Sequence, residues 1–362
     1  MDDWPAHLVR FGLALIGGMA LGFAGRRGRF CTLGAIEDAT YGRDWTRMRA
    51  WALATGVAVV LTQTLSLTGI IDLDESVYVS TPYTWPAYVV GGLSFGFGMA
   101  LVGTCGFGTL LRVGGGDLRA LVTFLVVAVA AYAALRGLAS VGRIALADRL
   151  PIGRPGTIHP ASLGWIAYVL TALIVGALAA FAFHRSELPK RPWLMVTGIV
   201  VGAAVAYGWW VTGVAGSDPL ELGRLESYTF VAPLAQALMY VMTASITQPD
   251  FPHGAVLGVA VGAYAAAVQS GEFRWEAYDD AREMKRHLVG GVLMGVGGVT
   301  ALGCTIGQGV TGISTLSMGS FIATASILAG ARGGLYWLIE RPLLHGRKKP
   351  DGCTRARSPA ET

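Results

Sequence analysis

Residues 91–108 read GGLSFGFGMALVGTCGFG, and a similar stretch, GGVLMGVGGVTALGCTIG, occupies residues 290–307. Aligned without gaps at an offset of 199 residues, the two stretches share five glycines and one cysteine, which is Cys105 in the first and Cys304 in the second. Self-similarity at a fixed offset indicates a chain built from two related halves. Each stretch is an apolar run that ends at a cysteine, so the repeat predicts the same structural unit twice.

The composition places this repeat in a membrane. Of the 362 residues, 53% are hydrophobic and only 14% are charged, whereas about 25% of the residues of a soluble domain are charged. Several apolar runs reach the roughly 20 residues needed to cross a lipid bilayer. The fold class we predict is an all-α polytopic membrane protein. Its net charge of +5 reflects arginines in loops beside apolar runs, a mark of membrane topology and not of nucleic-acid binding.

We predict about nine transmembrane helices plus short re-entrant helices, which are too short, too polar or too rich in glycine to cross comfortably. Segment 229–246 could just cross, but only nine spans leave the basic segment 345–350 on the cytoplasmic side. The predicted spans are 8–25, 50–71, 85–103, 118–138, 163–183, 193–213, 254–270, 288–303 and 318–339. The predicted short helices lie around 30–42, 104–113, 229–246 and 304–314.

The repeat divides the predicted spans into two units. We expect one transmembrane domain over 1–345, with repeat one at about 8–140, a linking span at about 163–183 and repeat two at about 193–340. A single linking span turns the second repeat upside down, and inverted repeats are typical of transporters whose substrate passes between them. A basic cytoplasmic tail, 346–362, follows.

The distribution of charged residues predicts how the chain is oriented in the membrane. Basic residues concentrate in cytoplasmic loops, and the segment between the first two predicted spans holds six arginines, while the acidic stretch 72–75 holds neither lysine nor arginine. We therefore expect a multi-pass protein of the bacterial inner membrane with its N-terminus outside and its C-terminus in the cytoplasm. The six arginines are Arg26, Arg27, Arg29, Arg43, Arg47 and Arg49.

Cysteines are the candidate substrate-path residues. Cys105 and Cys304 each open a short glycine-rich piece, and unwound backbone inside a membrane must be shielded from lipid or line a polar cavity. They are either small packing residues or parts of a path that also includes Gly106 and Gly303. Gln308 follows Cys304 by four residues, so it could donate to an oxyanion or satisfy a neighbouring carbonyl.

Cys31 is the third candidate. It follows an arginine cluster in GRRGRFC, and at the offset of 199 its counterpart is Phe230, so the two halves carry thiols unequally. Arg29 and Arg112 are either anchors at the cytoplasmic side or guides for an anion. Histidines without metal-ligand spacing, and the absence of a paired CxxC motif or a nucleotide-binding loop, predict no metal and no cofactor.

Three motifs carry a resemblance to a known family. GRRGRFCTLGAIEDA, GFGMALVGTCGFGTLLRVGGGDLRA and GVGGVTALGCTIGQGVTGIST resemble the YeeE/YedE sulfur-transport family, over about residues 10–345. The resemblance implies an inverted-repeat fold and cysteines that hold thiosulfate through S–H···S contacts and pass it inward. It matches Cys105 and Cys304 to two glycine-flanked family cysteines. It also implies a small cytoplasmic sulfur-carrier protein as a partner.

The function we predict is import of a small sulfur-containing anion, most simply thiosulfate, by a protein that is not an enzyme. The unequal placement of Cys31 leaves the sulfur compound open, so a permease or channel for another compound such as sulfite is an alternative. A membrane thiol oxidoreductase or sulfurtransferase is a second alternative, although it would need a resolving cysteine or a cofactor site. A passive channel for a small neutral solute is a third.

Overall fold

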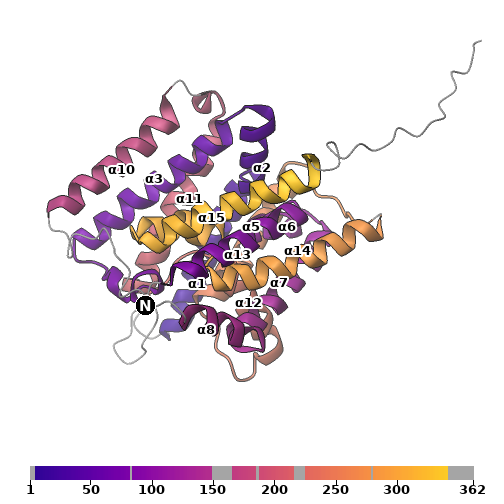
Figure 1. Ribbon diagram of the computed structural model, residues 1–362. Helices are drawn as coiled ribbons and strands as arrows, with labels where there is room; N and C mark the ends of the chain where they lie inside the picture. The colour runs from indigo at the N-terminus through magenta and orange to yellow at the C-terminus, as the bar shows by residue number, and fades with distance from the viewer. Residues whose placement is uncertain are drawn as a thin grey trace, which may run out of the picture.

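The computed structural model describes residues 5–81, 84–148, 165–184, 187–215, 225–278 and 280–340. Within these ranges the chain is almost entirely helical and forms no β-strand (Figure 1). The predicted tail 346–362, with Cys353, lies outside them. The long helices are α1 (Ala6–Arg27), α3 (Thr46–Leu67), α5 (Trp85–Val102), α7 (Leu118–Arg136), α10 (Trp165–Phe183), α11 (Pro192–Trp210), α13 (Phe251–Gln269), α14 (Ala281–Thr300) and α15 (Met318–Leu335). The shorter elements are α2 (Thr32–Glu37), η1 (Asp38–Gly42), η2 (Leu73–Glu75), α4 (Val77–Ser80), α6 (Gly106–Gly114), α8 (Ala139–Asp148), η3 (Leu188–Lys190), η4 (Val211–Ala215), α12 (Ala232–Thr243), η5 (Gly307–Gly312) and η6 (Tyr336–Glu340).

The structure confirms an all-α polytopic membrane protein. Among the described residues, 7 helical segments are long and apolar enough to cross a bilayer, and they contain α1, α3, α5, α7, α11, α13 and α15. The other two predicted spans coincide with α10 and α14 but fall outside this set. In α10 the apolar stretch that qualifies, Tyr168–Phe183, is shorter, and the first turns of α14 carry Arg282, Glu283, Lys285 and Arg286. Nine crossings therefore remain a prediction.

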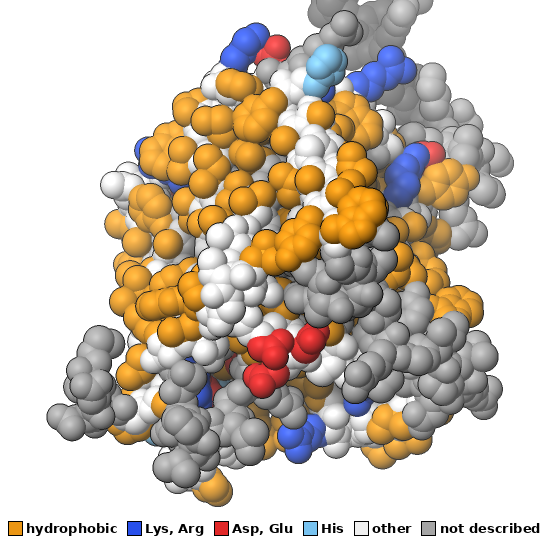
Figure 2. Space-filling view, turned by 90° about the vertical axis from the view of Figure 1, so that its left-hand side faces the viewer, with side chains coloured by type: hydrophobic (Ala, Val, Ile, Leu, Met, Phe, Trp, Pro, Cys, Tyr) orange, Lys and Arg blue, Asp and Glu red, His pale blue; other side chains and the backbone are white. Residues whose placement is uncertain are grey.

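The surface has the pattern of a protein surrounded by lipid. Figure 2 shows hydrophobic side chains over the middle of one face, with charged side chains gathered toward its upper and lower ends. Large apolar side chains on α1, α7 and α13 point outward, among them Ile16, Val129 and Val268, each more than half exposed. Hydrocarbon, not water, is the medium in which such a face is stable.

Helix contacts fall into pairs that match the order of elements in the two predicted repeats. The contact of α1 with α13 has a counterpart in that of α11 with α3, and the contact of α5 with α15 has one in that of α14 with α7. The repeated glycines form the crossing of α5 and α14: a Cβ at Gly98 would lie 2.6 Å from the carbonyl oxygen of Gly290, and one at Gly91 would lie 2.8 Å from that of Gly297. Small residues let membrane helices approach this closely.

A glycine in the first repeated stretch provides a stability prediction. At Gly96, a Cβ would overlap the carbonyl oxygen of Ile327 and lie 2.6 Å from the backbone nitrogen of Ala331. Gly96→Ala is therefore expected to destabilise the packing of α5 on α15 by about 1–3 kcal/mol, the usual cost of overpacking. Heating the detergent-solubilised protein and measuring the monodisperse fraction should show a lower midpoint. Gly12→Ala is the control, because a Cβ there meets nothing within 4 Å, and equal midpoints for both variants would contradict this packing.

Short helices occupy the predicted positions in both halves. At a rise of 1.5 Å per residue, the 12 residues of α12 extend roughly 18 Å, which is well short of the roughly 30 Å hydrocarbon core. The segment 229–246 thus forms a short helix, as predicted, and it packs against α7 and α13. In the first half, α6 packs against the same two long helices. These short helices bring the cysteines into the interior.

Candidate functional site

Three cysteines occupy the same local position, the residue that caps the start of a short helix. The first backbone N–H groups of a helix have no partner within the helix, and here a sulfur accepts from the residue three positions later. All three of these later residues are glycines, which gives a C-x-x-G pattern. The pairs are Gly34 N–H to Cys31 Sγ (3.5 Å), Gly108 N–H to Cys105 Sγ (3.5 Å) and Gly307 N–H to Cys304 Sγ (3.4 Å).

The fourth equivalent position, just before α12, has neither the cysteine nor the glycine that the other three share. Phe230 stands where Cys31 stands in the first half, and Pro233 stands in place of Gly34. Proline has no backbone N–H, so this short helix lacks both the thiol and the donor. The Phe230 ring is fully buried and packs on Phe107, with ring centroids 5.1 Å apart. An aromatic contact thus occupies the place of a fourth cap.

A threonine hydroxyl lies near each of the two buried thiols. Thr32 Oγ1 is 4.0 Å from Cys105 Sγ, and Thr229 Oγ1 is 4.0 Å from Cys304 Sγ. Neither threonine was predicted as a site residue from the sequence. Their only sequence signal is position, since Thr32 follows Cys31 directly and Thr229 directly precedes its counterpart Phe230.

A cavity of about 420 Å³ opens beside Cys31, and we call it the arginine cavity. Its wall includes Thr104, which directly precedes Cys105 in the chain, and Gly108, whose N–H donates to the Cys105 sulfur. Both predicted anion guides, Arg29 and Arg112, line it. The complete set of charged lining residues is Arg26, Arg29, Arg47, Arg112, Glu37 and Glu272.

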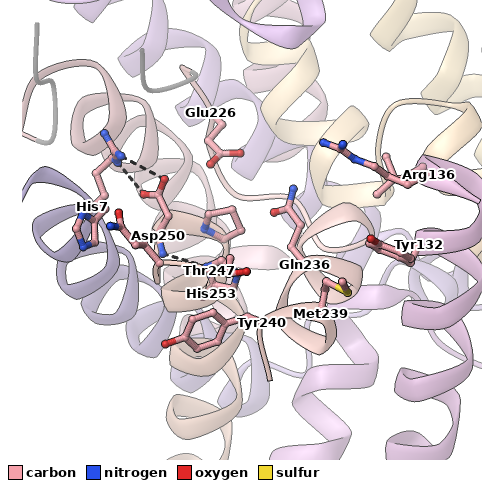
Figure 3. A pocket seen from close by; sticks show the side chains of 14 residues that line it. His7, Tyr132, Arg136, Glu226, Gln236, Met239, Tyr240, Thr247, Asp250 and His253 are labelled. Carbon is pink, nitrogen blue, oxygen red and sulfur yellow. Dashed lines mark hydrogen bonds and ion pairs between the residues drawn. The ribbon is translucent and has the colours of Figure 1, made fainter. Parts of the chain in front are cut away.

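Two further cavities adjoin each other, and the smaller of them is lined by Gly303, which directly precedes Cys304 in the chain. The smaller one, of about 170 Å³, is lined by Thr229, Tyr78 and Gly303, and we call it the threonine cavity. It shares Leu135, Glu226 and Gln236 with a larger one of about 740 Å³, the wide cavity. Figure 3 shows Glu226, Gln236 and Arg136 around the space of the wide cavity.

The arginine cavity and the wide cavity lie at opposite ends of α1. The wide cavity contacts Arg10 and the arginine cavity contacts Arg26; sixteen residues of helix separate these two by roughly 24 Å. Among the described residues, the arginine cavity shares no lining residue with the other two. Cys105 and Cys304, which are 2% and 0% exposed, lie between the two cavity systems. Thr32, which follows Cys31 in the chain, places its hydroxyl 4.0 Å from the Cys105 sulfur and so links these two positions.

The other predicted path residues have close neighbours. At Gly106, a Cβ would lie 2.8 Å from the Phe230 carbonyl oxygen, so only glycine fits without a shift there. Gly303 lines the threonine cavity. Gln308 is fully buried and its Nε2 donates to the carbonyl oxygen of Ala301. Of the two roles left open for Gln308, the structure shows the carbonyl contact.

The chemistry available at this site is that of free thiols and hydroxyls. Cys31, Cys105 and Cys304 are all free, and nowhere in the described ranges do three or more His, Cys, Asp or Glu side chains gather as a metal site would require. Thiols are weak, polarizable donors and acceptors. Such groups suit brief contacts with a soft solute.

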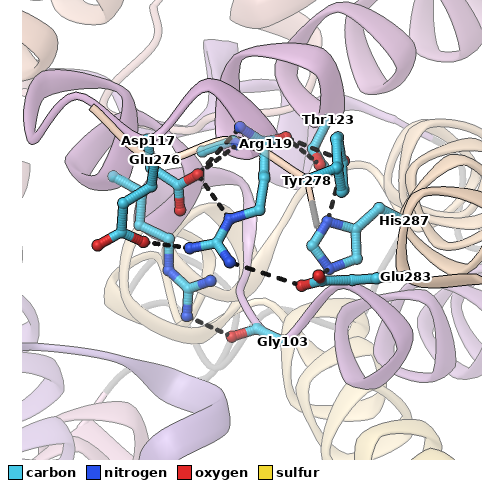
Figure 4. Close-up of polar contacts among 10 residues, drawn as sticks. Gly103, Asp117, Arg119, Thr123, Glu276, Tyr278, Glu283 and His287 are labelled. Atoms are coloured by element: carbon cyan, nitrogen blue, oxygen red, sulfur yellow. Dashed lines mark hydrogen bonds and ion pairs between the residues drawn. The ribbon is translucent and has the colours of Figure 1, made fainter. Parts of the chain in front are cut away.

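Polar contacts fasten the loop that follows α13 to the start of α7 (Figure 4). Arg119 pairs with Asp117 at 3.1 Å, with Glu283 at 3.8 Å and with Glu276. A backbone hydrogen bond adds to these ion pairs: the N–H of Leu118 donates to the carbonyl oxygen of Glu276 at 2.8 Å. This loop carries Glu272 and is therefore held in place at the rim of the arginine cavity.

A membrane-spanning helical protein with a cavity toward each end and thiols between them has the architecture of a transporter. The chain belongs to the sulphur transport family, whose model matches residues 27–332. It is similar to the thiosulfate transporter TsuA of Escherichia coli (strain K12), at 28% identity over 347 residues that cover 91% of this chain and 94% of that protein. It is also similar to the thiosulfate transporter TsuA of Spirochaeta thermophila, at 26% identity over 341 residues that cover 90% and 98% of the two chains. The protein is a multi-pass membrane transporter of a sulfur compound, and the family resemblance expected from the motifs is confirmed.

Proposed function

We propose that this protein imports thiosulfate into the bacterial cytoplasm through a path lined by Cys304, Cys105 and Cys31. The observation that carries the proposal is the position of the two buried thiols between the wide cavity and the arginine cavity, which lie at opposite ends of α1. The names of the two similar transporters support thiosulfate as the substrate.

The physical problem is desolvation. A divalent anion cannot enter hydrocarbon bare, so the path must supply donors that replace water and still let the anion leave. In the proposed path the anion enters the wide cavity, reaches the threonine cavity, and meets Cys304 and Thr229 together. The hydroxyl serves a hard sulfonate oxygen and the thiol serves the soft terminal sulfur. Cys105 with Thr32 repeats this pair, and Cys31 then delivers the anion to the arginine cavity.

The proposed orientation follows from charge. The arginine cavity, at the C-terminal end of α1, faces the cytoplasm, because that end holds the densest group of arginines between predicted spans. The N-terminus then lies outside and the C-terminal tail inside the inner membrane. The two halves act as inverted repeats within one transmembrane domain, as the paired helix contacts support. A small cytoplasmic sulfur-carrier protein receives the anion.

A substrate panel in proteoliposomes tests the proposal. Purified protein should accumulate labelled thiosulfate faster than empty vesicles do, and faster than it accumulates sulfite, sulfate or sulfide. Uptake of sulfite in preference to thiosulfate would mean that sulfite is the substrate, and the proposed path would still hold. Equal permeation by uncharged solutes of similar size would instead identify a passive channel. A persulfide on any of the three cysteines as an obligatory turnover intermediate would identify an enzyme.

A further inference from the structure

The arginine cavity carries more positive than negative charge. Four arginines line it against two glutamates, Glu37 and Glu272. Glu272 belongs to the loop after α13 and lies at the cavity's edge, with its side chain 43% exposed. Its carboxylate pairs with Arg29 at 3.2 Å and approaches Arg26 at 3.8 Å. One loop carboxylate thus contacts two of the four arginines and offsets one of their two charges.

The other two arginines are engaged by the helices themselves. Arg47 pairs with Asp38 at 3.3 Å, and Arg112 donates to the carbonyl of Gly103 at 2.9 Å. Arg26 is bound less completely, because its buried Nε has no hydrogen-bond partner among the described residues. Arg26 and Arg29 are therefore the guanidinium groups that an anion could engage by displacing a single carboxylate.

We propose that the arginine cavity is a binding site for a divalent tetrahedral sulfur oxyanion, and that Glu272 is a built-in competitor for that site. Arginine binds such oxyanions through paired N–H groups. The anion and the Glu272 carboxylate need the same donors on Arg26 and Arg29, so only one of them occupies these donors at a time. The naming of thiosulfate as the transported anion rests on the proposed function, whereas the competition does not.

Competition between Glu272 and the anion would help to release the anion during transport. An anion held by Arg26 and Arg29 with no competing carboxylate would leave slowly, and conduction needs binding that is weak enough to release. When Glu272 returns to Arg26 and Arg29, it takes over the donors that the anion gives up, which lowers the cost of release. The contacts of Arg119 and Glu276 hold the loop at the rim and keep Glu272 within reach.

Equilibrium binding of radiolabelled sulfate and thiosulfate to the detergent-solubilised protein tests the competition. Glu272→Gln, which keeps the shape and removes the charge, is expected to bind both anions about threefold to fivefold more tightly than the parent, as the strength of partly exposed ion pairs implies. Glu187→Gln is the matched control, because Glu187 is an exposed carboxylate paired with Lys190 at 2.7 Å outside the cavity. Equal affinities in the parent and Glu272→Gln would overturn the proposal.

Chemical modification of the Cys31 thiol tests whether the anion binds in the arginine cavity. In a Cys353→Ser background, sulfate should slow the reaction of Cys31 with a negatively charged methanethiosulfonate reagent, and Glu272→Gln should speed that reaction in the absence of sulfate. Arg29→Gln should do the opposite. Anion binding that leaves the Cys31 reaction rate unchanged would place the anion elsewhere and overturn the site. A protein that binds sulfate in this way but takes up no thiosulfate would refute the proposed function and leave this inference standing.

Discussion

Cys105→Ala and Cys304→Ala are each expected to lower thiosulfate uptake into proteoliposomes at least about tenfold, because a hydrogen bond to a charged ligand contributes roughly 1.5–3 kcal/mol. Both sulfurs are buried between the two cavity systems, so no water can take over the lost contact. Each alanine also leaves a short-helix N–H, that of Gly108 or Gly307, without its sulfur acceptor. Initial rates from vesicles with matched protein content measure the effect.

Two further variants separate the thiol's chemistry from its volume. Cys304→Ser keeps a donor of similar size but replaces the soft sulfur with a hard oxygen, so its uptake should fall between those of the parent and Cys304→Ala. Cys353→Ser, in the polar stretch KKPDGCTRARS, should transport like the parent. Parental uptake by both alanine variants, with their presence in the membrane confirmed, would remove the cysteines from the path.

Thr229→Val is expected to raise the thiosulfate concentration needed for half-maximal uptake about tenfold or more, by the same loss of a hydrogen bond to a charged ligand. Thr229 lines the threonine cavity and its hydroxyl lies 4.0 Å from Cys304 Sγ, so we expect it to bind the same anion as the thiol. Valine matches threonine in shape, and the change therefore removes a donor without opening a cavity. Concentration dependence of uptake is the measurement.

Thr229→Ser is the matched control for this position. Serine keeps the hydroxyl and loses a methyl group, so its half-maximal concentration should stay near that of the parent. If serine and valine impair uptake equally, the threonine acts through packing near Gly307, where Tyr78 also lies close, and not through its hydroxyl.

Much of the fold was predictable because the glycines that repeat in sequence also meet in space. Gly91 and Gly98 contact Gly297 and Gly290, the positions that the alignment had already singled out. Apolar runs likewise predicted the long helices, since burying a backbone in lipid requires it to be helical. α14 falls outside the helices that meet the length and hydropathy of a crossing, because its charged first turns shorten its apolar stretch.

The candidate site was predictable only in part. Local context was enough to select Cys31, Cys105 and Cys304, and the arginine cluster was enough to suggest Arg29 and Arg112 as anion guides. Glu272 and Thr229 carry no such context, since an isolated glutamate in a loop and a threonine before an aromatic residue are common. They lie beside Arg29 and Cys304 only because α1 packs along α13 and the short segments cross inside the protein.

By itself, the sequence determined that this is a helical membrane protein of a sulfur-transport family with cysteines that open short glycine-rich segments. The repeat at a fixed offset, the length of apolar runs and a cysteine at the start of a glycine-rich piece are all properties of the linear sequence, so they can be read along the chain. The tertiary structure alone decided that two buried thiols separate two cavity systems, and that Glu272 closes on Arg26 and Arg29. Those arrangements depend on contacts between residues as far apart as 243 positions, which only the packing of the helices brings together.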